Sequence, residues 1–351
     1  MKFGLFGGAV IKNDTDSGDS IGYQPFFDLI LEAEDLGFEN MFMVEHHFGG
    51  DGQISASLNL LSYLAAKTST LRLGTAVTVL PWHNPVLLAE QVATLDVLSK
   101  GRVDFGVGKG YRENEYKGFC IPKEEAFDRY KESLDILKQS WTSTERFNFK
   151  GNFWQYNDIL VEPSPVQKPH PPLWSAAGSN ESIQAVAGAG FNVLFDHFAN
   201  FERTQQRIDI WKQECDKIGR DFNPHEVVLA RGLTITSSNR EYEEAMQKRE
   251  NRVSKMIAKY GALPGIKSER PNSYSDKGPD IDDAALIGEP EVIIKRLKIL
   301  EKMGFKHINI LLPDERESLQ VFSEQVMPEF KESANVSQLN SPPVLDQNIT
   351  T

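Results

Sequence analysis

The residues Leu36-Gly37-Phe38-Glu39-Asn40-Met41-Phe42-Met43-Val44-Glu45-His46-His47 carry the pattern that decides the fold. A helical period over residues 23–36 stops at a glycine, and an apolar run over residues 39–44 follows at once. Glycine accepts the left-handed backbone that ends a helix, and a short apolar run bounded in this way is typical of a buried strand. The stretch therefore predicts a helix leading into a strand that ends in a carboxylate and two imidazoles.

The same pattern, a helical segment that ends in glycine and is followed by phenylalanine, recurs at Ala189-Gly190-Phe191 and Met303-Gly304-Phe305. Strands are predicted at residues 2–6, 39–44, 71–79, 102–107, 172–176, 192–194, 227–235 and 307–312. Helices are predicted at residues 23–36, 85–99, 123–141, 182–189, 201–218, 242–260, 290–303 and 315–330. Alternating strand and helix units build a parallel sheet, and about eight of them close it. We therefore expect an α/β fold, a single (β/α)8 TIM barrel over residues 1–332.

Three segments depart from this alternation. Residues 148–168 are rich in aromatic and turn residues, which predicts an excursion between a helix and the next strand. Residues 261–283 are polar and broken by Pro and Gly, which predicts a mobile loop that is either a lid or a disordered surface excursion. Residues 333–351 lose all periodicity, so a flexible C-terminal tail is expected there.

Composition excludes several classes of protein. The 351 residues carry a formal net charge of −12, and their Lys and Arg are interleaved with acids, so nucleic acid is not an expected partner. The cysteines, Cys120 and Cys215, stand far apart and match no zinc spacing or disulfide framework, which fits a reducing cytoplasm. No apolar run reaches transmembrane length, and the glycine-broken residues 1–11 favour a first strand over a signal peptide.

Chemistry is most strongly indicated at Glu45-His46-His47. Polar residues at the carboxyl end of a barrel strand lie on the face that carries catalysis. Adjacent strand residues point in opposite directions, so one histidine should face the barrel mouth while the other packs behind it. A metal site and structural histidines remain alternatives, although no HExxH or similar ligand spacing accompanies the pair.

At these residues the sequence resembles a family. Glu45-His46-His47-Phe48 is similar to the Glu-His-His-Phe signature of the bacterial luciferase-like monooxygenases. The resemblance continues, in the family's order and spacing, through Leu73-Gly74-Thr75-Ala76-Val77-Thr78-Val79-Leu80-Pro81, His83-Asn84-Pro85-Val86, Asp96-Val97-Leu98-Ser99-Lys100-Gly101-Arg102 and Gly106-Val107-Gly108-Lys109-Gly110-Tyr111. It covers the first 200 residues well and the remainder by pattern, and it implies the luciferase-like form of the TIM barrel.

The resemblance implies roles for particular residues. His46 corresponds to the catalytic histidine beside the flavin, where it would handle protons and stabilise the flavin C4a-peroxide. Glu45 and His47 would orient it. The Ala76-Val77 peptide corresponds to a non-proline cis bond that packs against the flavin ring.

For the cofactor phosphate, the resemblance implies Lys109, which stands in place of an arginine, together with Ser179 and Ser182. The turn Ala177-Gly178-Ser179 follows a predicted strand and opens a helix, and helix N-termini bind phosphate, although plain helix capping explains such serines equally well. Arg129 is a further candidate for the phosphate charge or a solvated surface residue.

Two glycines mark departures from the luciferases. Gly108 replaces the reactive thiol of the light-emitting subunit, so bioluminescence is not implied, and Gly178 replaces a glutamate of the phosphate turn. A dinucleotide site at Gly106-Val107-Gly108-Lys109-Gly110 is disfavoured, because Tyr111 stands where a third glycine is needed.

The implied function is a two-component monooxygenase. Reduced FMN (FMNH2) would come from a separate NAD(P)H:flavin reductase and react with O2 to oxygenate a small organic substrate. The alternatives are an F420-dependent oxidoreductase on the same barrel and a non-catalytic flavin-binding protein. The aromatic residues near strand ends are candidates for the substrate pocket or for the core: Phe6, Trp82, Phe119 and Trp174.

A homodimer is also implied, formed through helices near the second and third barrel units. The apolar stripes at residues 58–66 and 86–98 fit such an interface. Burial within one subunit explains the same stripes.

Overall fold

The parallel strands close into a barrel in the computed structural model, which describes residues 1–9, 22–50, 52, 54–260, 285–313 and 316–331. The strands follow the order β3, β2, β1, β13, β10, β9, β8 and β5, and β5 pairs again with β3. Their bounds are β1 Lys2–Gly7, β2 Asn40–Met43, β3 Arg72–Thr75, β5 Val103–Gly108, β8 Leu173–Ala176, β9 Asn192–Phe195, β10 Val227–Arg231 and β13 His307–Leu311. The predicted (β/α)8 barrel is confirmed.

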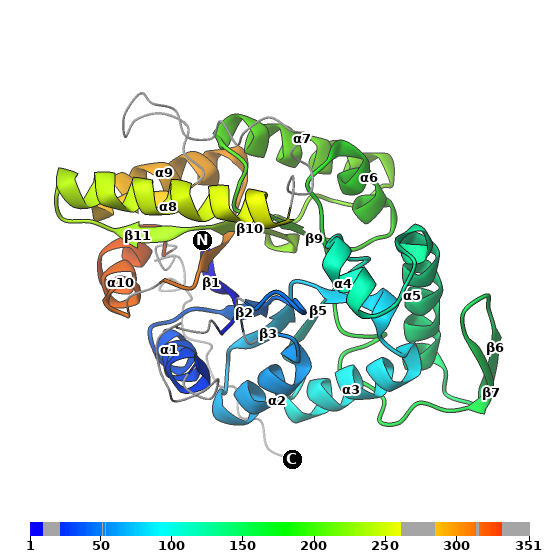
Figure 1. Cartoon of the computed structure of the whole chain (residues 1–351). Coiled ribbons are helices and arrows are strands. Elements are labelled where there is room, and N and C mark those ends of the chain that lie inside the picture. The colour runs from blue at the N-terminus through cyan, green and yellow to red at the C-terminus, as the bar shows by residue number, and fades with distance from the viewer. Residues whose placement is uncertain (10–21, 51, 53, 261–284, 314–315, 332–351) are drawn as a thin grey trace, which may run out of the picture.

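Helices surround the strands, with α1 to α3 below and α6 to α9 above in the view of Figure 1. Their bounds are α1 Tyr23–Asp35, α2 Ser57–Lys67, α3 Pro85–Leu98, α4 Glu113–Gly118, α5 Ala126–Thr142, α6 Asn180–Gly188, α7 Phe201–Lys217, α8 Asn239–Tyr260, α9 Pro290–Met303 and α10 Glu317–Val321. Gly304 ends α9 with a left-handed φ of 111°, as its position after the helical period predicts.

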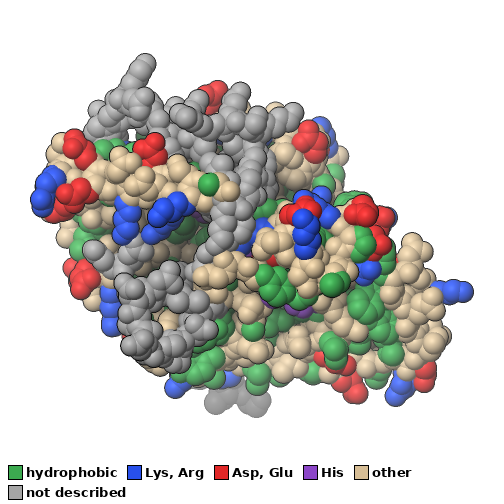
Figure 2. Space-filling view, viewed as in Figure 1, with side chains coloured by type: hydrophobic (Ala, Val, Ile, Leu, Met, Phe, Trp, Pro, Cys, Tyr) green, Lys and Arg blue, Asp and Glu red, His purple; other side chains and the backbone are tan. Residues whose placement is uncertain are grey.

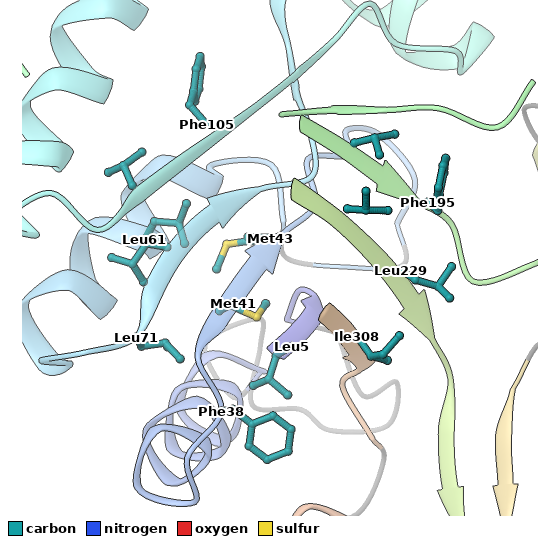
Figure 3. Close-up of a cluster of buried hydrophobic side chains, with 14 of the residues drawn as sticks. Leu5, Phe38, Met41, Met43, Leu61, Leu71, Phe105, Phe195, Leu229 and Ile308 are labelled. Carbon is teal, nitrogen blue, oxygen red and sulfur yellow. The ribbon is translucent and has the colours of Figure 1, made fainter. Parts of the chain in front are cut away.

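The strands have two apolar faces, as expected of a parallel barrel. Leu5, Met41 and Met43 belong to the core between strands and helices, where Figure 3 shows Met41 and Met43 on one strand. Phe42, between the two methionines, belongs instead to a second cluster inside the barrel. The period of two therefore separates a layer beneath the helices from side chains that fill the barrel.

A polar cluster fills the amino end of the barrel. Asn309 on β13 donates from Nδ2 to Asn40 Oδ1 at 2.7 Å, and the Asn40 amide also bonds His307 Nε2. A Cβ on Gly4 would lie 2.2 Å from Asn40 Oδ1, so only glycine leaves room for this cluster. Burial, and then the charge of Lys2, lowers the pKa of His307 to about 3, so its imidazole is neutral.

Two predicted strands are corrected. The run 71–79 is interrupted at Ala76-Val77, and β4 (Thr78–Val79) continues beyond it, paired with β5. The run 227–235 breaks at Gly232: β10 stays in the barrel, while β11 (Leu233–Ile235) forms a separate parallel pair with β12 (Leu286–Gly288). The strand β12 was not predicted, because a three-residue element is too short for its period to show.

The excursion at residues 148–168 contains an antiparallel hairpin of β6 (Phe147–Lys150) and β7 (Gln155–Ile159), which projects at the right of Figure 1. Its turn is held by the carboxylate of Glu132 on α5, which accepts the backbone N–H groups of residues 152–154. The predicted loop at residues 261–283 and the predicted tail at residues 333–351 lie outside the described residues.

Candidate active site

His46 lies just beyond the carboxyl end of β2 and is held by Glu115 of α4. The imidazole Nδ1 lies 3.1 Å from Glu115 Oε1, and the same oxygen accepts the backbone N–H of His47 at 2.9 Å. Because a carboxylate oxygen only accepts, Nδ1 carries the proton and Nε2 remains an acceptor. Burial lowers the pKa of His46, and the hydrogen bond to Glu115 offsets this only in part, so the imidazole is neutral near pH 7.

Glu45 and His47 form a separate cluster. Glu45 is 3% exposed, and its Oε1 accepts from His47 Nε2 at 3.2 Å, His83 Nε2 at 2.9 Å and Trp82 Nε1 at 2.9 Å. Burial raises the pKa of Glu45, but these hydrogen bonds outweigh burial and hold it at about 2. The carboxylate that hydrogen-bonds His46 is thus that of Glu115, and the role of Glu45 and His47 in orienting His46 stays a prediction.

Glycines bring β5 against the junction of β3 and β4. The Ala76-Val77 peptide bond is cis, as the resemblance implies. The hydroxyl of Thr75 donates to the Gly106 carbonyl at 2.7 Å and accepts the Gly106 N–H at 2.9 Å. A Cβ would lie 1.9 Å from Thr75 O at Gly106 and 2.5 Å from Val77 Cγ2 at Gly108. Backbone alone therefore forms this part of the barrel wall.

The predicted phosphate turn forms a capping box at the start of α6. The Ser179 side chain accepts the Ser182 N–H, and the Ser182 hydroxyl accepts the N–H groups of Gly178 and Ser179, each at 3.0 Å. Ser179 and Ser182 therefore cap the start of α6, whether or not the turn also binds a ligand. The two helix-capping hydroxyls and the following backbone N–H groups are donors of the kind that bind phosphate.

Two arginines of α7 complete this turn and were not predicted. Arg203 Nη2 donates to the Gly178 carbonyl at 3.2 Å, and Arg207 Nε donates to the same oxygen at 3.0 Å. Arg207 also pairs with Asp196 at 3.0 Å. Their spacing of four residues on a helix puts them on one face, which is a signal that the sequence did contain.

The other two predicted cations differ in position. Lys109 follows β5 with an exposed side chain, and its carbonyl accepts the Tyr116 hydroxyl. Arg129 on α5 pairs with Glu125 at 2.8 Å and lies 4.4 Å over the ring of Phe153. Arg129 thus contacts its own helix and the β6–β7 hairpin, whereas Arg203 and Arg207 contact the turn before α6.

The four aromatic candidates form two groups. Trp82 stacks on Phe119 with ring centres 5.2 Å apart, and both rings lie edge-on to His47. Trp174 is buried against Phe42 inside the barrel, in a cluster against which Phe6, Ala76 and Val77 also pack. One group therefore surrounds the Glu45 cluster, while Phe6 and Trp174 lie at the cis peptide.

The described residues contain neither a candidate metal cluster nor a candidate membrane-spanning helix. Across the part of the chain that the structure describes, no three His, Cys, Asp or Glu side chains are arranged to hold a metal ion. Within the same residues, no helix combines the length and the apolar character needed to cross a bilayer. Cys120 and Cys215 are both free thiols.

The chain is similar to named enzymes over nearly its whole length. It is 27% identical to the oxygenase component of the flavin-dependent trigonelline monooxygenase of Acinetobacter baylyi, over 95% of this chain and 96% of that protein. It is also 26% identical to an F420-dependent glucose-6-phosphate dehydrogenase of Nakamurella multipartita, over 90% of this chain and 95% of that protein. The relatives therefore include enzymes named for two different cofactors, flavin and F420.

The fold and the family agree. The crystal structure of monooxygenase RslO1 from Streptomyces bottropensis superposes with a TM-score of 0.78 at 22% identity, covering 94% of this chain and 100% of that one. The family model described as luciferase-like monooxygenase matches residues 1–307. With its closed barrel and its His46 site, the chain belongs to the luciferase-like monooxygenase family and is an enzyme of that kind.

Proposed function

We propose that this enzyme is the oxygenase component of a two-component system, which binds reduced FMN and uses O2 to oxygenate a small organic substrate. The observation that carries the proposal is the pair of His46 and Glu115 at the carboxyl end of β2. That end of β2 lies beside the cis peptide, because the Ala76 N–H donates to the Met43 carbonyl at 2.7 Å.

The residues present fit FMN. The barrel wall at Gly106 and Gly108 is bare backbone, and a Cβ at either position would collide with the residues around the cis peptide. Ser179, Ser182 and Arg203 surround the start of α6 with hydroxyl and guanidinium donors, which suit a phosphate dianion. We therefore assign the ring to the Ala76-Val77 side of the barrel mouth and the phosphate to this turn.

The side chains of the site would have separate roles in the proposed reaction. Bound reduced flavin would supply the electrons that activate O2. His46 Nε2, as an acceptor, would take or return a proton at the barrel mouth, and Glu115 would stabilise the imidazolium whenever the ring is protonated. The phosphate turn would fix the cofactor, and the aromatic cluster around Phe42 would keep water from the barrel interior.

The proposal includes two protein partners. A separate NAD(P)H:flavin reductase would supply the reduced cofactor, as the component name of the Acinetobacter relative indicates for that system. A second copy of the chain would pack against α2 and α3, whose outer faces carry exposed apolar side chains such as Tyr63 and Leu87.

The test compares product formation with cofactor binding. The purified enzyme is combined with a flavin reductase, NADH, FMN and 18O2, and a panel of small organic compounds is screened by mass spectrometry for incorporated label. His46→Ala should reduce labelled product by roughly 100-fold or more, since a positioned acid–base group contributes about that much. FMN binding, measured by fluorescence quenching, should stay within about threefold.

The control is His225→Ala, at an exposed histidine that precedes β10 and thus lies at the opposite end of the barrel. It should change neither product nor binding. Unchanged turnover in His46→Ala would remove His46 from its assigned role. Tight binding of F420 without FMN binding would support the alternative, an F420-dependent oxidoreductase.

A further inference from the structure

Glu115, the residue that hydrogen-bonds His46, stands on a helix that is too short to be stable by itself. The helix α4 has six residues, and isolated helices shorter than about 12 residues are marginal in water. Glu115 is 1% exposed, and its carboxylate is turned toward the end of β2. The position of Glu115 therefore depends on the side chains that pack against α4 and its flanking residues.

Trp82 contacts this segment at three places. Its ring centre lies 5.2 Å from that of Tyr116, which is within α4. It also stacks on Phe119, the residue after α4, with ring centres 5.2 Å apart. Before α4, a Cβ on Gly110 would lie 2.8 Å from Cη2 of Trp82, so the backbone there packs directly on the indole. The segment that carries Glu115 thus meets one tryptophan before, within and after the helix.

Trp82 is itself held by Glu45. It is the last residue of the 3-10 turn η2 (Leu80–Trp82), and its Nε1 donates to Glu45 Oε1 at 2.9 Å. His83 Nε2 lies 2.9 Å from the same oxygen. The ionised carboxylate of Glu45 is 3% exposed, and hydrogen bonds to a charged group are stronger than those between neutral groups. One carboxylate at the end of β2 therefore fixes both Trp82 and His83.

These interactions form a closed chain of contacts that starts and ends beside β2. Glu45 holds Trp82, and Trp82 packs against α4 and its flanking residues. Glu115 of α4 then returns to His46 Nδ1 at 3.1 Å and to the His47 N–H at 2.9 Å. Glu45 and His46 are neighbours in the chain, so both ends of this chain of contacts lie at one strand end. A displaced Trp82 should therefore displace Glu115 from the ring of His46.

We propose that Trp82 is a positioning residue, which fixes α4 so that Glu115 holds His46 in the tautomer with its proton on Nδ1. The inference rests on the proposed function, because it takes proton transfer at His46 Nε2 as the step that needs this tautomer. The other role open to Trp82 is contact with the substrate. The two roles differ in what replacement of Trp82 does to His46.

The first experiment measures the tautomer of His46 in the full chain without cofactor or substrate. The protein is labelled with 15N-histidine, and the ring nitrogens of His46, assigned with His46→Gln, are observed by NMR at pH 8, where the imidazole is neutral. In the parent protein we expect the Nδ1–H form, because a nitrogen that bonds a carboxylate keeps its proton. Trp82→Leu should lose this form, and Nε2–H, which histidine favours in water, should become the main one.

Two more variants separate this role from a general loss of packing. Trp82→Phe keeps a ring against Phe119 but loses the bond to Glu45, so it should retain more of the Nδ1–H form than Trp82→Leu and less than the parent. The matched control is Trp154→Leu, which removes a partly buried tryptophan just before β7 of the hairpin and should leave His46 unchanged. Thermal melts check folding, and if Trp82→Leu does not fold, Trp82→Phe decides the comparison.

The second experiment measures turnover in the 18O2 assay, with the panel compound that the parent protein labels most. Trp82→Leu should lower kcat about tenfold or more and leave KM within about threefold, because a misplacement of about 1 Å can cost about 100-fold in rate. In the Glu115→Ala background the same substitution should lower kcat less than about twofold, since the residue through which it acts is absent. A residue that contacts substrate would instead raise KM and act equally in both backgrounds.

The outcomes distinguish this inference from the proposed function. A parent protein without the Nδ1–H form, or a form that persists in the folded Trp82 variants, would overturn the positioning role. Equal losses of turnover with and without Glu115 would overturn it as well. A parent protein that labels no compound would instead count against the proposed function, and the tautomer of His46 would still decide whether Trp82 positions Glu115.

Discussion

His46 depends on a residue 69 positions further along the chain. Glu115 holds the imidazole by Nδ1 and the adjacent backbone by the His47 N–H, so one oxygen fixes both the ring and the strand end. Arg112 lies 3.8 Å from that oxygen and adds positive charge beside the pair. The protonation of His46 is thus a balance between burial and Arg112, which lower its pKa, and Glu115, which raises it.

Replacing Glu115 should shift this balance in a measurable direction. In Glu115→Gln the amide oxygen still accepts from Nδ1, but the negative charge that favours the imidazolium is lost. We expect the pKa of His46 to fall further below its usual value. NMR titration of the histidine Cε1–H signals, assigned with His46→Gln, measures it. A pKa that rises or stays constant would contradict the assigned pairing.

The phosphate turn gives a second prediction at this scale. Ser182→Ala removes the acceptor of two backbone N–H groups, which should cost about 1–2 kcal/mol of stability. FMN affinity should fall about tenfold while riboflavin affinity stays constant, since only FMN carries the phosphate. The control is Ser237→Ala, which removes a hydroxyl that bonds Glu241 near the start of α8. Equal losses for both ligands would show that the turn does not contact phosphate.

The sequence predicted some of these residues and not others. His46, Ser179 and Ser182 lie where a strand ends or a helix starts, and such ends can be located from local pattern. Glu115 and Arg203 act through contacts between distant segments. The local pattern places Arg203 and Arg207 on one face of a helix, but it does not show which distant segment that face contacts. For the same reason Glu45 was assigned to His46, its neighbour in sequence, although its hydrogen bonds are to His47, His83 and Trp82.

Among the elements, α3 is unusual because three of its exposed side chains are large and apolar. Its exposed positions are Leu87, Gln91, Thr94, Val97 and Leu98, and none of these five carries a charge. Leu87 is 56% exposed and Leu98 is 59% exposed. In Figure 2 green side chains alternate with tan ones over the lower part of the molecule, where α2 and α3 lie in Figure 1. A surface of this kind is typical of an interface between subunits.

Negative charge on the outer face of α3 should therefore prevent formation of the proposed dimer. We expect the protein to elute as a dimer and the double variant Leu87→Glu, Leu98→Glu to elute as a monomer near 39.5 kDa, because a buried unpaired carboxylate is costly. Light scattering during size exclusion measures the mass. Ile299→Glu on α9, at an apolar position that is 42% exposed, is the matched control and should remain dimeric. A monomeric parent protein would remove the proposed interface.

The elements themselves followed closely from the sequence. The barrel strands were found because each follows a helical segment as a short apolar run, whereas the hairpin strands β6 and β7 and the short helix α4 were not predicted. The break at Gly232 was missed, because β-rich residues stand on both sides of Arg231-Gly232 and the partner strands are not known from the sequence. After Gly232 the chain leaves β13 and pairs with β12, and that pairing is decided by tertiary structure.

At the scale of the whole molecule, buried titratable groups make the folded protein less stable in acid. His307 is neutral in the polar cluster at the amino end of the barrel, with a pKa of about 3 against 6.5 when exposed. Its contribution to stability is complete above pH 6.5 and is lost as the pH falls from 6.5 toward 3, because the unfolded chain then binds a proton that the folded chain does not. Glu45 adds a loss in the same direction between pH 4.5 and 2.

The free energy of unfolding should therefore fall on acidification by about 1.4 kcal/mol per pH unit for His307 in this window. Urea denaturation at pH 7.5, 6.0 and 5.0 measures the slope. His307→Gln, whose amide oxygen can accept from Asn40, should flatten it. A slope unaffected by His307→Gln would mean that the histidine is protonated in the folded protein.

The pairing of β1 with β13 sets when this barrel can close during synthesis. Lys2 lies opposite His307, and at roughly 5–20 residues per second the ribosome takes roughly 15 to 60 s to reach the partner strand. Throughout that time one edge of β1 has no strand beside it. We expect the growing chain to depend on chaperones for that interval, and a chain cut before β13 to aggregate through the two open edges, β1 and β10.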